Sequence, residues 1–238
     1  MKNQNSPKLL RLLKGDLLFL FKYGIFLVYS VFIVVYLVAL HYISEPARSL
    51  FIKLLVFSDP AAMGLFFMGA VVLLEKSQRV NSSLAVSPVT TKAYVLSKAL
   101  AFMLAGLAVG LVIAAGSGHL LNLWAVIGVI GASLLFSMAG LFIACKARSL
   151  NQFIMLSLPV EILISTPAFF YPFGKLTSPL WIFHPGLAAM RLLFTSGEVN
   201  FAESLTCLSS LIFWNIFVFR FTKGAADKMF KSLGGGSL

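Results

Sequence analysis

The residue types that bind metals or form disulfides are sparse in this sequence and stand far apart. His41, His119 and His184 each occur singly, without a second ligand at the spacing of a metal site. Cys145 and Cys207 are expected near opposite faces of a membrane, so both should remain free thiols. The sequence therefore predicts no metal site and no structural disulfide.

Hydrolytic chemistry finds equally little support. The run GSGH at residues 116–119 contains serine and histidine, but it lacks the G-x-S-x-G spacing and is typical of a tight turn. No G-x-x-x-x-G-K-[ST] phosphate loop occurs, so the chain does not bind ATP by that device. Paired carboxylates are missing too, which argues against an intramembrane protease or lipid hydrolase. We expect no enzyme activity and no bound cofactor from this chain alone.

Two acidic residues stand out because of their surroundings. Glu161 lies within an apolar run, where a charge costs on the order of 3 kcal/mol by insertion scales. It could line a cavity that meets cationic or polar cargo, or it could bond locally to Ser157 or Ser165, one helical turn away. Asp59 is followed by Pro60, a pair typical of a helix cap and the first helical turn.

The composition determines the class of protein that must position these residues. Of the 238 residues, 59% are hydrophobic and 11% are charged, against about 25% charged in soluble domains. The apolar runs are uninterrupted and lack the alternation of barrel strands, so the bilayer leaves only spanning helices. The sequence predicts an all-α, polytopic membrane protein.

Six spans are expected from runs of about 20 mostly apolar residues, the length that crosses a hydrocarbon core. The fifth is interrupted by prolines and by Glu161, so a kinked or partly re-entrant segment is plausible there. Together they form a single transmembrane domain over residues 1–233. The six expected spans are 23–43, 54–74, 94–115, 121–145, 153–173 and 202–221.

Orientation follows from the distribution of the 19 Lys and Arg residues. With the N-terminus in the cytoplasm, the outer segments hold only Arg48, Lys53, Lys175 and Arg191. We therefore expect both termini on the cytoplasmic side of a prokaryotic plasma membrane. The net charge of +11 then lies against the anionic inner leaflet, and no basic patch interleaved with exposed aromatics favours nucleic acid as a partner.

The two ends of the chain differ from the spans. Residues 8–22, KLLRLLKGDLLFLFK, combine leucines with basic residues and are typical of a helix in the headgroup plane. Their apolar run is too long for a signal peptide, and no small-residue cleavage site follows it. The run GGGSL at 234–238 is typical of a remnant linker.

The longest polar break, residues 75–92, separates the second and third spans. Ser87 and Pro88 have the types of a helix N-cap and first helical residue. A helix from Pro88 to Ala115 would measure about 42 Å at 1.5 Å per residue, longer than the hydrocarbon core. The break should therefore form an amphipathic knob, held at a fixed distance below the membrane by a stiff helix.

Glu75 followed by SSLAVSPV at residues 82–89 resembles the membrane subunit of type-two ABC exporters. That family has a glutamate-led E-x-E-x-G-T-x-x-x-L-x-V-[ST]-P-V segment that forms the coupling helix for an ATPase. Here Ser77 replaces the second acid, and Arg79 and Val80 stand where Gly-Thr is usual. The residues expected to couple to the ATPase are Glu75, Arg79, Asn81, Ser82, Ser83, Leu84, Val86, Ser87 and Pro88.

The resemblance implies the rest of an exporter. It implies six spans, an interfacial N-terminal helix, and two short re-entrant helices within SPLWIFHPGLAAMRLLF at residues 178–194. It also implies a second permease, most simply another copy, and separate ATPase subunits that carry ATP and Mg²⁺. Within the family the match is most similar to drug-export permeases of the fluoroquinolone type.

The expected cargo is amphipathic, since Phe and Leu dominate the spans and fixed charge is scarce. Phe66 and Phe67 are candidates for lining its route, although aromatic residues in spans more often pack or face lipid. Two alternatives remain open. One is a secondary transporter driven by an ion gradient, for which Glu161 is the available coupling group. The other is a non-transporting immunity or assembly subunit of an ABC complex.

Overall fold

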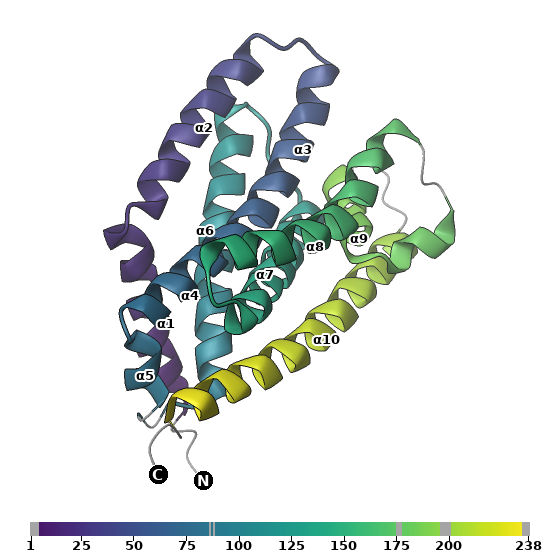
Figure 1. Ribbon diagram of the computed structural model, residues 1–238. Coiled ribbons are helices and arrows are strands. Elements are labelled where there is room, and N and C mark those ends of the chain that lie inside the picture. The colour runs from purple at the N-terminus through teal and green to yellow at the C-terminus, as the bar shows by residue number, and fades with distance from the viewer. Residues whose placement is uncertain (1–4, 86, 88, 175–177, 196–200, 235–238) are drawn as a thin grey trace.

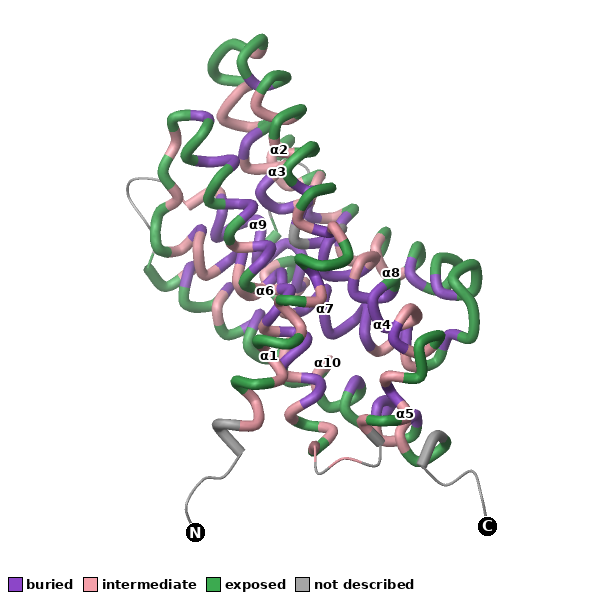
Figure 2. The backbone as a smooth tube through the Cα atoms, turned by 90° about the vertical axis from the view of Figure 1, so that its left-hand side faces the viewer, coloured by how far each residue is buried: buried purple, intermediate pink, exposed green. Residues whose placement is uncertain are grey.

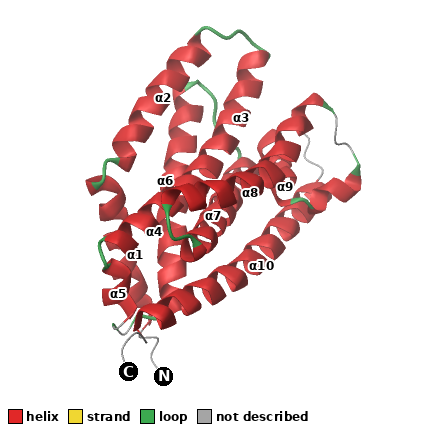
Figure 3. Cartoon of the chain, viewed as in Figure 1, coloured by secondary structure: helices red, strands yellow, loops and turns green. Residues whose placement is uncertain are grey.

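The computed structural model describes residues 5–85, 87, 89–174, 178–195 and 201–234. Helices account for nearly all of this part of the chain, and it contains no strand (Figure 3). The all-α prediction is therefore confirmed. In chain order the elements are α1 (Asn5–Lys22), α2 (Ile25–His41), α3 (Ala47–Ala62), η1 (Met63–Phe67), α4 (Met68–Ser77), α5 (Val80–Ala85), α6 (Thr91–Gly116), α7 (Leu123–Lys146), α8 (Leu150–Phe170), η2 (Tyr171–Phe173), η3 (Pro179–Phe183), α9 (Pro185–Phe194) and α10 (Phe201–Gly234).

Five helical stretches in the described residues are long and apolar enough to cross a membrane. They are 47–77, 91–116, 123–146, 150–173 and 201–232, so each expected span from the second to the sixth has a counterpart. The count reaches six if α1 and α2, which meet at an angle of 62°, are taken as one broken span. In length and composition, these helices are those of a polytopic membrane protein.

The break between α1 and α2 lies at Gly24, whose φ of 72° is left-handed. Glycine adopts this conformation without steric cost, so the chain can turn sharply between two apolar helices. The sequence predicts a separate helix over 8–22, and α1 occupies that position (Figure 1).

The expectation that Asp59 caps a helix start is wrong. Asp59 and Pro60 lie inside a helix that runs from Ala47 to Ser77. Proline has no N–H to donate within the helix. The helix nevertheless continues, and directly after α3 it widens to the π-helical segment η1, which has an extra residue per turn. The helix therefore continues where the local sequence predicts a beginning.

The core of the molecule is built around α7, which contacts α3, η1, α4, α6, α9 and α10. The buried residues lie along the middle of the molecule in Figure 2, while α2 and much of α8 are exposed. Glycines allow the closest approaches. A Cβ at Gly140 of α7 would lie 2.4 Å from the carbonyl oxygen of Leu65 in η1.

We expect Gly140→Ala to lower the free energy of unfolding by about 1–3 kcal/mol, the usual cost of forcing one extra carbon into a packed interior. The backbone of η1 would have to move, because its carbonyl groups occupy the space. Thermal unfolding of the purified protein in detergent measures the effect. Gly224→Ala is the control, since no atom lies within 4 Å of its added Cβ. Equal melting points for the two variants would contradict this packing.

The α2–α3 and α6–α7 turns lie at the same end of the bundle and are bonded to each other. Arg48 Nη2 donates to the carbonyl oxygen of Ser117 over 3.1 Å, and His119 Nε2 lies 3.6 Å from Glu45 Oε1. Asn122 of the same turn bonds to the backbone of Thr195. These are the turns that the charge distribution assigns to one side of the membrane.

The segment before α10 forms two short helices, η3 and α9, with the break at Pro185. Helix α9 is buried from Pro185 to Leu193, and it contacts α7, α8 and α10. The buried Arg191 of α9 pairs with Glu203 of α10, Nη1 to Oε1, at 2.8 Å. This ion pair attaches the short helix to the start of α10.

Candidate functional site

The break between the second and third spans is structured rather than a free loop. Arg79 adopts a φ of 57° at the turn between α4 and α5, and α5 then packs against α4 and α10. Figure 1 shows α5 at the same end of the molecule as the start of α1 and the last turns of α10. The expected knob is therefore a six-residue helix mounted on the bundle.

The candidate coupling residues divide by exposure. Arg79 and Ser83 are exposed, Ser82 and Ser87 are half-buried, and Val86 and Pro88 lie outside the described residues. Glu75 and Asn81 are buried, and the half-buried Leu84 packs against the protein's own core. Among the described candidates, Arg79, Ser82 and Ser83 thus offer outer surface to a partner, while Glu75, Asn81 and Leu84 face the protein interior.

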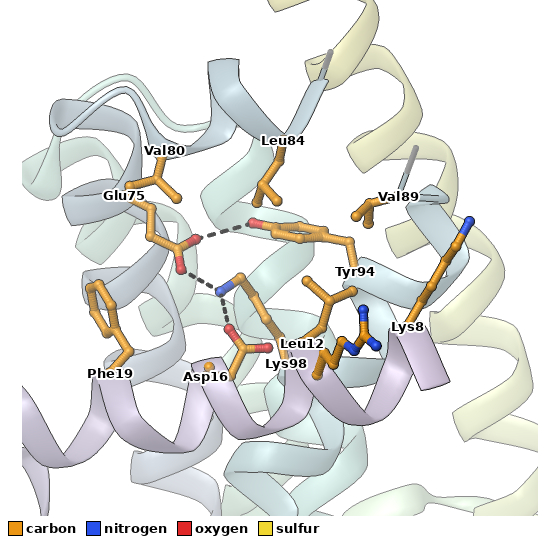
Figure 4. Close-up of a pocket in the computed structure, with 12 residues that line it drawn as sticks. Lys8, Leu12, Asp16, Phe19, Glu75, Val80, Leu84, Val89, Tyr94 and Lys98 are labelled. Carbon is orange, nitrogen blue, oxygen red and sulfur yellow. Dashed lines mark hydrogen bonds and ion pairs between the residues drawn. The ribbon is translucent and has the colours of Figure 1, made fainter. Parts of the chain in front are cut away.

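The carboxylates of Glu75 and Asp16 meet at Lys98 of α6 (Figure 4). Its ammonium nitrogen lies 2.5 Å from Oε1 of Glu75 on α4 and 3.0 Å from Oδ1 of Asp16 on α1. Only 2% of the Lys98 side chain is exposed, against 5% for Glu75 and 18% for Asp16. Ser97 donates a further bond to Asp16. One buried cation therefore links three helices.

Tyr94, one turn before Lys98, extends this cluster to α5. Its hydroxyl lies 3.5 Å from Glu75 Oε2 and 3.5 Å from Asn81 Oδ1. The ring packs edge-on against Phe230 of α10, with 5.0 Å between centroids. A displacement of α5 would thus reach the buried ion pairs directly through Asn81 and Tyr94.

A cavity of about 450 Å³ lies between α1, α5 and α6 beside the Lys98 cluster. Apolar side chains of α1 and α5 line it together with Tyr94 and Lys98, and Lys8 and Arg11 add positive charge (Figure 4). None of its groups has the geometry of a nucleophile with a general base. The arrangement can bind, orient and transmit movement.

The start of α6 differs from the prediction. Thr90 is the N-cap, since its side-chain oxygen accepts from the Ala93 N–H over 3.2 Å. Ser87 instead donates its hydroxyl to the Leu84 carbonyl at 2.8 Å and so closes α5. Both residues are good capping types, and the backbone direction after α5 decides which one caps α6.

A second set of bonds fixes the other side of α4. Lys76 Nζ donates to the carbonyl oxygens of Ala144, Cys145 and Ala147 over 2.6, 3.1 and 3.0 Å. Those carbonyls end α7, where a positive charge is favourable. Glu75 and Lys76 therefore attach the end of α4 to two different neighbours.

The remaining candidates lie away from this cluster. Glu161 Oε1 accepts from the Ser165 hydroxyl at 2.7 Å, whereas Ser157 bonds to the Ile154 backbone. Phe66 and Phe67 are half-buried in η1, and Phe67 packs against Tyr29 of α2 at 5.2 Å between ring centroids. Of these three residues, Glu161 has the local bond that its spacing predicts.

Sequence reasoning misses Lys98, Asp16 and Tyr94 as members of the site. By charge alone, Lys98 is one more cytoplasmic lysine, and Asp16 is part of a polar helix face. The usable signals are that Lys98 lies within the mostly apolar helix α6 and that Asp16 is the single acid among the basic residues of α1. Two opposite charges in apolar surroundings favour a buried pair.

No protein-family model, curated protein or solved structure matches this chain. The described residues also contain no group of three or more His, Cys, Asp or Glu side chains that could hold a metal ion. Function is therefore argued from the helices, the buried charges and the exposed surface.

Proposed function

We propose that this chain is the membrane-spanning permease subunit of an ATP-driven exporter, coupled to a separate ATPase through residues 75–92. The observation that carries the proposal is the mounting of α5. A connection between spans needs no buried charges, yet Glu75, Asp16 and Lys98 form a three-helix ion cluster directly beside it. Burying these charges carries a desolvation cost that a simple connection would avoid, and the Asn81–Tyr94 bond links α5 to the cluster on α6.

The mechanism is a shift between two populations. Closure of the ATPase on ATP would push α5, and the continuous helix α6 would carry that displacement along its 26 residues. The bonds of Tyr94 and Lys98 would make α1 and α4 follow. ATP and Mg²⁺ bind to the partner ATPase. They shift the permease between its two states only if the ATP-bound ATPase has a higher affinity for one state than for the other.

The exposed apolar faces support a bilayer and a second copy as partners. Large apolar side chains are exposed on α2, α8 and α10, far more than a soluble surface carries. Lipid would cover part of this area, and a second permease the rest. Members of these faces include Leu27, Val31 and Val35 on α2, Met155, Ile162 and Leu163 on α8, and Ile212, Ile216 and Phe221 on α10.

The cargo and the sidedness follow from composition. We propose amphipathic or hydrophobic, drug-like substrates, export across a prokaryotic plasma membrane, and both termini on the cytoplasmic side. The short helices η3 and α9 would then enter the membrane from the outer side. Proximity of α5 to the ends of α1 and α10 supports placing all three on one side (Figure 1).

Purification of the chain from native membranes tests the proposal. An ABC ATPase in the eluate, with ATP hydrolysis stimulated by the permease, is the expected result. Recovery of the chain without any ATPase, together with full transport after deletion of the gene for the ATPase, would overturn it.

We expect Glu161→Gln to leave ATP-driven export and the melting temperature close to wild type. The amide oxygen of glutamine keeps the bond from Ser165, and the variant removes only a proton-binding group. Transport into inverted vesicles with ATP measures export, and a proton gradient without ATP is the comparison. Loss of gradient-driven transport in this variant would instead support a secondary transporter. Ser165→Ala, which removes the local bond alone, is the control.

A further inference from the structure

A basic cavity that the proposed function does not use lies on the other side of α5. It measures about 400 Å³, is open on one side, and is lined by residues of α4, α5, the α7–α8 turn and the end of α10. Its lining includes three cationic side chains and no carboxylate. The cations are Lys76, Lys146 and Arg148.

The charges in this cavity are not neutralised by the protein. The ammonium group of Lys76 donates to three backbone carbonyls at the end of α7. Its charge therefore compensates the partial negative charge of that helix end. No carboxylate of the described residues lies within ion-pair distance of Lys146 or Arg148. Lys146 Nζ lies 4.1 Å from the centroid of the Phe142 ring, a neutral partner, so neither side chain has a counter-charge among the described residues.

One of the residues that line this cavity has a buried donor without a partner. Asn81 of α5 is 1% exposed, and its side-chain nitrogen has no hydrogen-bond partner among the described residues. Its side-chain oxygen is taken by Tyr94. Burial of an unpaired N–H group is unfavourable, and an acceptor oxygen that reached it would remove that cost. Ser82, on the same wall, adds a hydroxyl.

We propose that this cavity binds a phosphate group. Two cations, an amide donor and a hydroxyl converge without any acid, and phosphate oxygens accept from all of these. The cavity opens where α7 ends and α8 begins, at the edge of the apolar bundle. An anionic phospholipid headgroup and a free phosphate share this chemistry. Binding at this site does not require an ATPase. A bound phosphate group would contact α5, because Asn81 and Ser82 line the cavity.

The test is a binding titration of the purified full chain in neutral detergent. The probes are a short-chain phosphatidylglycerol, inorganic phosphate and, as a zwitterionic comparison, a short-chain phosphatidylcholine. The variant is Lys146→Gln/Arg148→Gln, whose two side chains are exposed, so their loss should leave folding intact. Lys22→Gln/Lys92→Gln removes the same charge from exposed positions outside the cavity.

We expect phosphatidylglycerol to bind the wild type and the control alike, and the cavity variant about thirtyfold more weakly, given about 1 kcal/mol per cation. Asn81→Leu should weaken binding as well, with the charge unchanged. Equal affinity for inorganic phosphate would assign the site to free phosphate rather than lipid. The proposal fails if neither anion binds, if phosphatidylcholine binds equally, or if the control loses as much affinity as the cavity variant.

Discussion

Lys98→Met is expected to lower the free energy of unfolding by about 3 kcal/mol or more, because it breaks two buried ion pairs at once. The variant removes the one cation between Glu75 and Asp16 and leaves two carboxylates facing each other in a buried site. Repulsion and the missing hydrogen bonds act in the same direction. Thermal unfolding followed by size-exclusion chromatography measures the loss.

Two companion variants separate the ion cluster from general helix effects. Lys92→Met changes an exposed lysine in the same helix, and it should leave stability unchanged. The triple variant Asp16→Asn/Glu75→Gln/Lys98→Met removes every charge of the cluster and should recover most of the loss. A Lys98→Met protein as stable as Lys92→Met would show that these charges do not meet in a buried site.

If residues 75–92 bind the proposed ATPase, Arg79→Glu/Ser83→Glu should reduce the stimulated ATP hydrolysis tenfold or more while the protein stays folded. Both side chains lie on the exposed surface around α5, so new carboxylates would meet a partner rather than the core. A tenfold loss corresponds to about 1.4 kcal/mol of coupling. The measurement is ATPase activity of the reconstituted complex, with the melting temperature of the permease recorded alongside it.

The matched comparison for that pair is Lys228→Glu, a charge reversal on the exposed face of the last turns of α10. Hydrolysis should stay near wild type in this variant, because the change lies off α5. Unchanged stimulation by Arg79→Glu/Ser83→Glu would mean that another segment contacts the ATPase. A similar loss in both variants would indicate a nonspecific charge effect.

Much of the fold could be predicted because apolar runs in a bilayer leave few options. The expected spans from the second to the sixth each overlap an observed helix, and the helix over 8–22 is present as α1. Boundaries were less predictable. Asp59 with Pro60 has the local chemistry of a helix start, yet packing keeps the helix continuous through both residues.

The candidate site was only partly predictable, because exposure depends on tertiary contacts. The sequence singles out Glu75 and Asn81 for contact with a partner, but both are buried and bonded within the chain. Asp16 and Lys98 are 82 residues apart, so no local spacing brings them together. The polar break itself was visible, since an amphipathic run between two spans requires a structural explanation.

The π-helical segment η1 has a consequence for any movement of α4. The segment Met63–Phe67 holds one more residue per turn than an α-helix. If it changed to α geometry, every side chain from Met68 to Ser77 would rotate by about 100° around the helix axis. Glu75 would swing away from Lys98, and Lys76 would leave the end of α7. A shift of one residue in the helix register at η1 would therefore break the contacts that anchor the end of α4, and α5 would be released with it.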